Sequence, residues 1–271
     1  MISVLSDMMS YTFIVRAMIV GGLVALCSAL LGVSLVLKRY SMIGDGLSHV
    51  AFAALTIAVA MNVAPLYIST PIVTVAAIIL LRLSENSKIK GDSAIALIST
   101  VSIAIGVVVT ALTKGMNTDV YSYMFGSILA MSESDVYMSI ALSVVVIILF
   151  VFFYNKIFAV TFDESFAKAT GTRADAYNMI IAVLTAITIV VGMRIMGTML
   201  ISSLIIFPAL ISMRNFKTFK SVILCSAIVS VVCFLLGIIL SYLYSIPTGA
   251  SIVLVNTVAL ILPYLIGELR H

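Results

Sequence analysis

The chain has 271 residues, of which 63% are hydrophobic and only 10% are charged, whereas soluble domains are about 45 to 50% apolar and about 25% charged. This composition predicts an all-α integral membrane protein that crosses the bilayer several times. It leaves no stretch of chain for a secreted disulfide scaffold, a nucleic-acid-binding domain or a large soluble catalytic domain. The net charge of +4 comes from Lys and Arg clusters between apolar runs, so it reports orientation in the membrane rather than affinity for polyanions.

Charged and turn-forming residues divide the chain into about nine apolar segments, when about 20 residues are allowed for each helical crossing. In chain order these segments span residues 12–37, 43–62, 66–82, 92–113, 135–155, 175–193, 195–213, 220–243 and 249–267. Basic residues test the division because they collect in cytoplasmic loops. If every second connection between segments lies on the same side of the membrane, 12 of the 15 Lys and Arg residues fall on one side. We therefore predict nine transmembrane helices, with the N-terminus outside and the C-terminus in the cytoplasm.

Two connections between the segments are longer than a turn requires. The outer one contains an apolar stretch at residues 120–131, which is too short to cross the bilayer and predicts an interfacial or re-entrant helix. The inner one contains the sequence FDESFAKATG, Phe162 to Gly171. This pattern predicts a short amphipathic helix that a glycine ends. Together the segments and connections predict a single transmembrane domain over residues 1–271.

Asp45 and His49 stand at the start of the second apolar segment, in the sequence GDGLSH. On a helix, residues i and i+4 share one face about 6 Å apart. Ionisable side chains at membrane depth are costly unless they border a polar cavity or a partner. An acid beside an imidazole is also a two-ligand fragment for Mn(II), Zn(II) or Fe(II). The plainer alternative is a helix-entry Asp near the membrane surface, with a packed His as its hydrogen-bond partner.

A second candidate site consists of Met193, Met196 and Met199, whose thioethers at three-residue spacing suit Cu(I). The chain contains 15 Met residues, and Met is a flexible apolar filler of helix contacts. We therefore favour packing over copper binding for these three residues.

Motifs for nucleotide hydrolysis and covalent catalysis are absent from the sequence. It contains no GxxxxGK[ST] loop, which would hold the phosphates of a nucleoside triphosphate. It also contains neither a serine nucleophile elbow nor an HExxH motif. We therefore expect that the chain is not an enzyme, and that any ATP hydrolysis that drives it occurs on another chain.

Three blocks of sequence resemble the membrane permease subunit of bacterial ABC transporters that import zinc, manganese or iron(II), the metal ABC-3 permease family. The blocks are KRYSMIGDGLSH (Lys38 to His49), FDESFAKATG (Phe162 to Gly171) and GTMLISSLIIFPA (Gly197 to Ala209). The resemblance implies a fold like that of type II ABC importers, in the cytoplasmic membrane of a bacterium. It also implies a homodimer, two cytoplasmic ABC ATPase subunits that use ATP, and an extracellular or periplasmic metal-binding protein.

The same resemblance implies roles for individual residues. Asp45 and His49 match acidic and His positions in the pore-lining helix of the family, where they would contact the transported metal. Two chains about a twofold axis would then supply four ligands. The Phe162 to Gly171 block would be the coupling helix that seats in the ATPase, with contacts from Asp163, Glu164, Phe166, Ala167 and Gly171. The metal is cargo, so no permanently bound cofactor is expected.

Two other function classes stay open in the sequence. A stand-alone secondary transporter would use Asp45 and His49 to relay protons and drive metal movement with a proton gradient. A membrane-bound metal sensor without flux is less favoured, because nine spans exceed what a sensor needs. Among the metals, Asp and His suit manganese, zinc and iron(II) alike.

Overall fold

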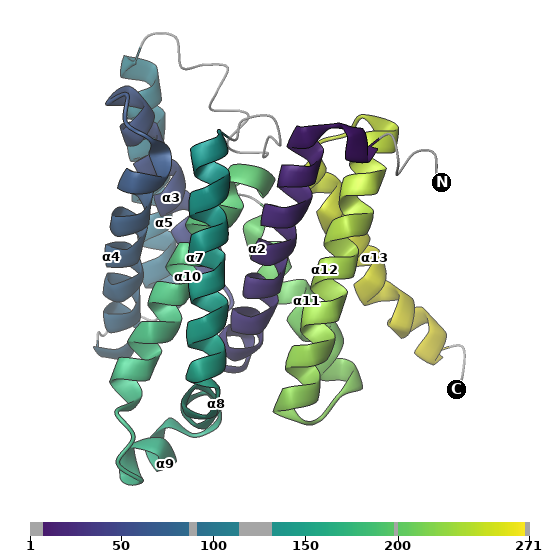
Figure 1. Ribbon diagram of the computed structural model, residues 1–271. Coiled ribbons are helices and arrows are strands. Elements are labelled where there is room, and N and C mark those ends of the chain that lie inside the picture. The colour runs from purple at the N-terminus through teal and green to yellow at the C-terminus, as the bar shows by residue number, and fades with distance from the viewer. Residues whose placement is uncertain (1–7, 87–90, 114–131, 198–199, 269–271) are drawn as a thin grey trace.

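The computed structural model describes residues 8–86, 91–113, 132–197 and 200–268. The regular elements in these ranges are all helices (Figure 1). The long ones are α2 (Thr12–Leu37), α3 (Ile43–Ala60), α4 (Pro65–Asn86), α5 (Gly91–Leu112), α7 (Glu133–Phe152), α10 (Ala174–Met196), α11 (Ile201–Asn215), α12 (Phe219–Tyr244) and α13 (Thr248–Glu268). Two short helices, α8 (Tyr154–Phe162) and α9 (Glu164–Ala169), lie together at the bottom of Figure 1.

The long helices confirm the prediction of an all-helical, multi-pass membrane protein. Within the described residues, seven of them are long and apolar enough to cross a bilayer, and α11 and α13 contribute shorter apolar stretches. Each predicted segment corresponds to one of these helices. The count of nine crossings and the side of each terminus stay predictions. The outer segment predicted at 120–131 lies outside the described residues.

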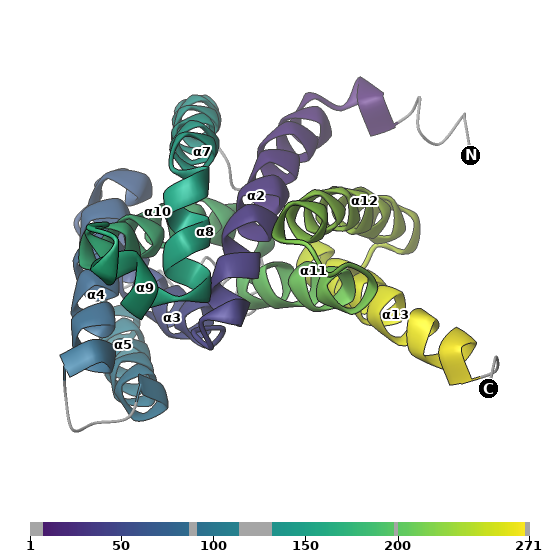
Figure 2. The ribbon, with the colours of Figure 1, turned by 90° about the horizontal axis from the view of Figure 1, so that it is seen from below.

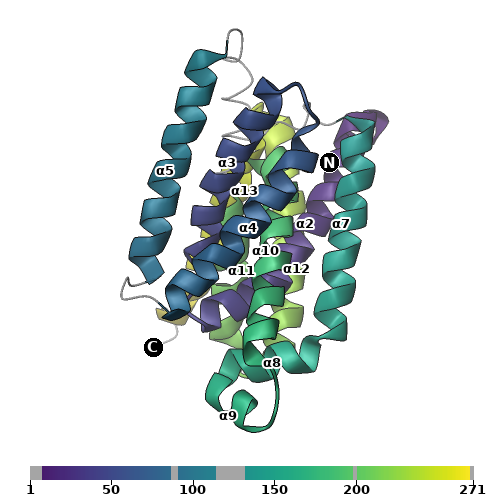
Figure 3. The same ribbon diagram turned by 90° about the vertical axis from the view of Figure 1, so that its left-hand side faces the viewer.

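Helix α2 lies at the centre of the bundle. It packs against α7 and α10 on one side and against α11 and α12 on the other, as the view along the helices shows (Figure 2). In both α2 and α3, 72% of the residues in the most apolar stretch of the helix are buried. In α5, only 11% of the corresponding residues are buried. Helix α5 lies at the edge of the molecule beside α3 (Figure 3), and its uncovered apolar face is left for lipid or for a second chain.

Small residues allow the helices of the bundle to approach closely. Inside a bilayer, helix association depends on tight packing and interhelical hydrogen bonds rather than on the hydrophobic effect. At Gly32 of α2, an added Cβ would lie 2.1 Å from the carbonyl oxygen of Ile205 in α11. On the other side of α2, the Ser230 hydroxyl of α12 donates to the carbonyl of Ala25 at 2.8 Å. These contacts hold α11 and α12 close to α2.

The boundary between α10 and α11 differs from the predicted one. The segments were expected to meet between residues 193 and 195, but α10 continues to Met196 and α11 begins at Ile201. Gly192 lies inside α10, where its lack of a side chain allows close packing: an added Cβ would lie 2.2 Å from Ile201 and 2.8 Å from Val24. The turn instead follows at Gly197, whose φ is 83°, a conformation that glycine adopts without strain.

Candidate metal site

The Asp45 and His49 side chains lie at the beginning of α3. Asp45 is in the first turn of the helix, where a carboxylate interacts favourably with the helix dipole. His49 follows one turn later, and its Nε2 atom is 3.6 Å from Oδ2 of Asp45. This distance is slightly longer than a hydrogen bond. The two groups therefore lie close enough to bind one cation without being locked to each other.

Two glycines on either side of Asp45 determine where its side chain points. A Cβ added at Gly44 would lie 3.0 Å from Ile205 of α11, and one added at Gly46 would lie 2.7 Å from Ile95 of α5. Successive residues of a helix are about 100° apart, so Asp45 faces the side of α3 between α11 and α5. Its side chain is 39% exposed in the single chain, and that of His49 is 18% exposed.

The single chain supplies too few ligands for a complete metal site. In the parts of the chain that the structure describes, no group of three or more His, Cys, Asp or Glu side chains is placed to hold a metal ion. Asp45 and His49 thus form an isolated pair, one carboxylate and one imidazole. Divalent transition metals accept both ligand types, and a second copy of the chain would bring the number of such side chains to four.

The Met residues of the alternative copper site lie in a different environment. Met193 and Met196 are each 1% exposed and belong to the apolar core. Met199 lies outside the described residues. The two described thioethers pack as core side chains at the end of α10, in agreement with the favoured interpretation of the sequence.

Helix α9 occupies most of the block from Phe162 to Gly171. Asp163 caps its N-terminus, because the carboxylate accepts a hydrogen bond from the main-chain N–H of Phe166 at 2.8 Å. At the other end, Gly171 has a φ of 80°, and the main-chain N–H groups of Gly171 and Thr172 donate to Lys168 and Ala167. This pattern is a Schellman motif, which glycine favours.

The remaining residues of the block point in opposite directions. Ala167 is buried against Val160 of α8 and Ala174 of α10. The Phe166 ring is 65% exposed and projects away from the bundle, available to a partner. Glu164 turns inward to α10, where its Oε2 accepts a hydrogen bond from the Asn178 amide at 3.1 Å. The helix therefore has an anchored face and an open face.

Two lysines complete the polar cluster around Glu164. Lys38, from the end of α2, lies 3.3 Å from Oε2, and Lys168 lies 3.1 Å from Oε1 and 2.9 Å from Asp175. Burial raises the pKa of Glu164, but hydrogen bonds from Asn178 and Lys168 and the charge of Lys38 outweigh it and leave this pKa below its ordinary value. Hydrogen bonds to Asp175 and Glu164 raise the pKa of Lys168.

Sequence reasoning missed the roles of Lys38 and Asn178 in this cluster. No sequence pattern pairs either residue with Glu164. Lys38 is 126 residues from Glu164 and 140 residues from Asn178 along the chain. The one local signal is that a Lys ends an apolar run near the cytoplasmic side, which many membrane proteins share.

Comparison with known proteins agrees with this architecture. The sequence model of the ABC 3 transport family matches residues 10–267. The chain belongs to the ABC 3 transport family. Membership confirms the family predicted from the three sequence blocks, and it makes this ABC 3 protein a membrane permease of an ABC transport system, in which a separate subunit hydrolyses ATP.

Named relatives of this ABC 3 permease share its full length. The manganese import system permease protein ScaB of Streptococcus gordonii is 25% identical over 95% of this chain and 92% of that protein. The high-affinity zinc uptake system membrane protein ZnuB of Haemophilus influenzae is 29% identical over 91% of this chain and 94% of that protein. The solved structure of PsaBC from Streptococcus pneumoniae in complex with Fab has a TM-score of 0.87 and 26% identity, with 97% of this chain and 95% of that chain covered.

Proposed function

We propose that this chain is the permease subunit of an ATP-driven importer for divalent metal ions, with manganese, zinc or iron(II) as cargo. The observation that carries the proposal is the pair of Asp45 and His49, 3.6 Å apart and partly exposed on a membrane-spanning helix. Ionisable side chains on membrane-spanning helices are functional by default. The manganese and zinc systems named for ScaB and ZnuB support the same class of cargo.

The proposed transporter contains two copies of the chain around one metal path. Asp45 faces the side of α3 between α5 and α11, and α5 leaves most of its apolar surface uncovered. A twofold axis beside this face would bring two carboxylates and two imidazoles together. Such a mixed oxygen and nitrogen site suits borderline divalent cations. The partners outside the membrane are a metal-binding protein that delivers the ion and two cytoplasmic ATPases.

Binding at the proposed site is transient. A divalent ion from the delivery protein enters from outside, exchanges some of its water for Asp45 and His49, and then leaves inward. Conduction requires a site that is favourable enough to enter and weak enough to leave. A single carboxylate and imidazole from each chain meet this requirement better than a closed cage of acids. Movement of the ATPases against α9 would tilt the spans and release the ion to the cytoplasm.

Transport into proteoliposomes tests the proposal against the proton-coupled alternative. The chain is reconstituted with its partner ATPase, and uptake of Mn²⁺, Zn²⁺ and Fe²⁺ is measured with ATP, with a nonhydrolysable analogue, and with a proton gradient alone. We expect uptake only with hydrolysable ATP, and competition among the three ions identifies the preferred cargo. Uptake by the chain alone, driven by the proton gradient, would overturn the proposal and favour secondary transport.

A further inference from the structure

We propose that Lys38 is a positioning residue that links α9 to the beginning of α3, so that movement of α9 reaches Asp45 and His49. The inference rests on the proposed function, in which α9 receives the ATPase. The inference adds a physical connection inside the permease between α9, which the ATPase would push, and α3, which carries Asp45 and His49.

Lys38 joins four helices through one ammonium group. It is the C-cap residue of α2, and its Nζ donates to the main-chain carbonyl of Val160 in α8 at 3.2 Å, to Glu164 in α9 at 3.3 Å and to Asn178 in α10. Three acceptors match the three N–H donors of an ammonium. The Lys38 side chain is only 9% exposed, so water competes little with these bonds.

The connection from Lys38 to α3 is short and has a fixed shape. Helix α3 begins five residues after Lys38. The main-chain N–H of Arg39 donates to Val36 at 3.1 Å, and that of Tyr40 donates to Leu35 at 2.8 Å, which together form a Schellman motif at the end of α2. Arg39 holds the required left-handed conformation with a φ of 61°. This turn ties the direction of α3 to the end of α2.

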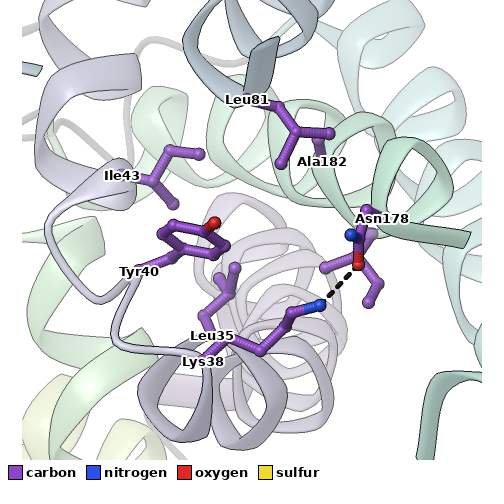
Figure 4. Close-up of a pocket in the computed structure, with 8 residues that line it drawn as sticks. Leu35, Lys38, Tyr40, Ile43, Leu81, Asn178 and Ala182 are labelled. Atoms are coloured by element: carbon purple, nitrogen blue, oxygen red, sulfur yellow. Dashed lines mark hydrogen bonds between the residues drawn. The ribbon is translucent and has the colours of Figure 1, made fainter. Parts of the chain in front are cut away.

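Side-chain packing stiffens the same connection. Tyr40 and Ile43 line, together with Lys38 and Asn178, a cavity of only about 10 Å³ (Figure 4). A space of this size holds no more than one water molecule, so the residues around it have little freedom to slide. Ile43 is the first residue of α3, and Asp45 follows two residues later. The short turn and this packing are the route by which a shift of the Lys38 ammonium would reach the metal pair.

Besides Lys38, the Asn178 amide holds Glu164 of α9, at 3.1 Å, and the remaining contacts of α9 are apolar or more exposed. Ala167 contributes a small apolar contact to α8 and α10, and the exposed Lys168 bridges Glu164 and Asp175. Beside them is an open polar cavity of about 550 Å³, lined in part by Tyr40, Arg82 and Glu164. Exposed ion pairs hold geometry poorly. The part-buried contact with Lys38 joins α9 to the end of α2.

The test measures how many metal ions are transported for each ATP hydrolysed by the reconstituted complex. Lys38→Met keeps the length and apolar stem of the side chain but removes its charge. Coupling between sites in proteins commonly corresponds to roughly 5- to 150-fold effects, so we expect about a tenfold fall in this ratio. Co-purification with the ATPase should persist, because Phe166 and the rest of the open face of α9 are unchanged.

Lys156→Met is the matched control. It removes the same charge from the exposed surface of α8 and should leave the ratio unchanged. A double-mutant cycle with Glu164→Gln measures whether the two substitutions affect the ratio independently. Loss of packing at Lys38 alone would not make their effects non-additive. Residues in one hydrogen-bonded unit have non-additive effects, so the double variant Lys38→Met/Glu164→Gln should be no worse than the poorer single variant. Additive losses would contradict a shared link.

Three further outcomes would overturn the inference. An unchanged ratio in Lys38→Met would show that the contact carries no motion. Loss of ATPase binding or of folded protein in that variant would assign Lys38 a structural role. The ratio would then also be unchanged in Asn178→Leu, which removes bonds to both Lys38 and Glu164. Absence of ATP-driven uptake in the unsubstituted complex would instead refute the proposed function, which makes the two failures distinguishable.

Discussion

Two groups of charged residues, around Glu164 and around Asp45, differ in how many ion-pair and hydrogen-bond partners they have. Around Glu164, the carboxylate receives bonds from Asn178, Lys168 and Lys38, and Lys168 in turn binds Asp175. Among the residues that the structure describes, the Asp45 carboxylate has one ion-pair partner, His49 at 3.6 Å, and its side chain is 39% exposed. The first group is matched within one chain, whereas the second is the pair that we propose to bind a cation.

This difference separates charges that hold helices together from charges that we propose to bind cargo. A cluster with every charge matched holds helices in place and gains nothing from a ligand. A carboxylate and an imidazole with free ligand positions on a membrane helix have a reason to bind a cation. If the distinction is correct, substitutions in the Asp45 pair should remove transport and spare assembly, whereas substitutions in the Glu164 cluster should act through α9, on its attachment or on its coupling to transport.

The largest effect is expected at the metal pair. Asp45→Ala or His49→Ala should reduce metal uptake to that of liposomes without the transporter, because each removes one ligand type from both copies of the site. Co-purification with the ATPase should persist. Ser48→Ala is the control on the same helix, since the Ser48 hydroxyl bonds only to the carbonyl of Asp45 within α3 at 2.7 Å. Normal uptake in both site variants would remove the proposed metal site.

The next effect concerns the attachment of α9. Glu164→Arg places a cation beside Lys38 and Lys168, and their repulsion should move α9 out of its seat. We expect the variant to lose co-purification with the ATPase. Asp175→Arg offers a matched charge reversal on a residue that contacts Lys168 but neither Lys38 nor Asn178, and it should retain more ATPase. Full recovery of the complex with Glu164→Arg would contradict the assignment of α9 as the coupling helix.

A smaller, pH-dependent effect follows from the pKa of Glu164. Because this pKa is lowered in the folded chain, the stabilisation is present above the unfolded value, about 4.3, and is lost as the pH falls through the folded value. The raised pKa of Lys168 acts at the alkaline end. Hydrogen-exchange protection of α9, corrected for intrinsic rates, should stay constant from about pH 5 to about pH 9. A loss of protection between pH 7 and pH 5 would speak against the cluster.

The smallest effect is expected at the cap of α9. Asp163→Ala removes the acceptor for the Phe166 N–H group and should destabilise the short helix by about 1 kcal/mol. Asp163→Asn keeps an oxygen acceptor and should preserve most of the protection of α9 in hydrogen exchange. Equal exchange in the Ala and Asn variants would show that the cap is not what orders this helix.

Local features of the fold could be predicted from the sequence. Long apolar runs predict membrane helices because lipid offers no partner for main-chain polar groups, and the i, i+4 spacing brings Asp45 and His49 together. Where α10 ends was harder to predict, because Gly192 serves packing against Ile201 rather than a turn. Propensity cannot distinguish these two uses of glycine.

The polar cluster could not be predicted because its members come from distant parts of the chain. The contact of Lys38 with Glu164 spans 126 residues and depends on how α2, α9 and α10 are placed by the whole bundle. The orientation of Asp45 depends in the same way on α5 and α11. Composition and spacing identify which residues are unusual, while tertiary packing decides which of them are satisfied.

The ligand count at Asp45 and His49 has a genetic consequence. Each chain contributes half of the proposed four-ligand site, so one defective copy spoils the site that it shares. A cell that makes equal amounts of normal and His49→Ala chains would assemble only about one quarter of its dimers from two normal copies, by random pairing across a twofold interface. Such a variant would therefore act as a dominant inhibitor of uptake.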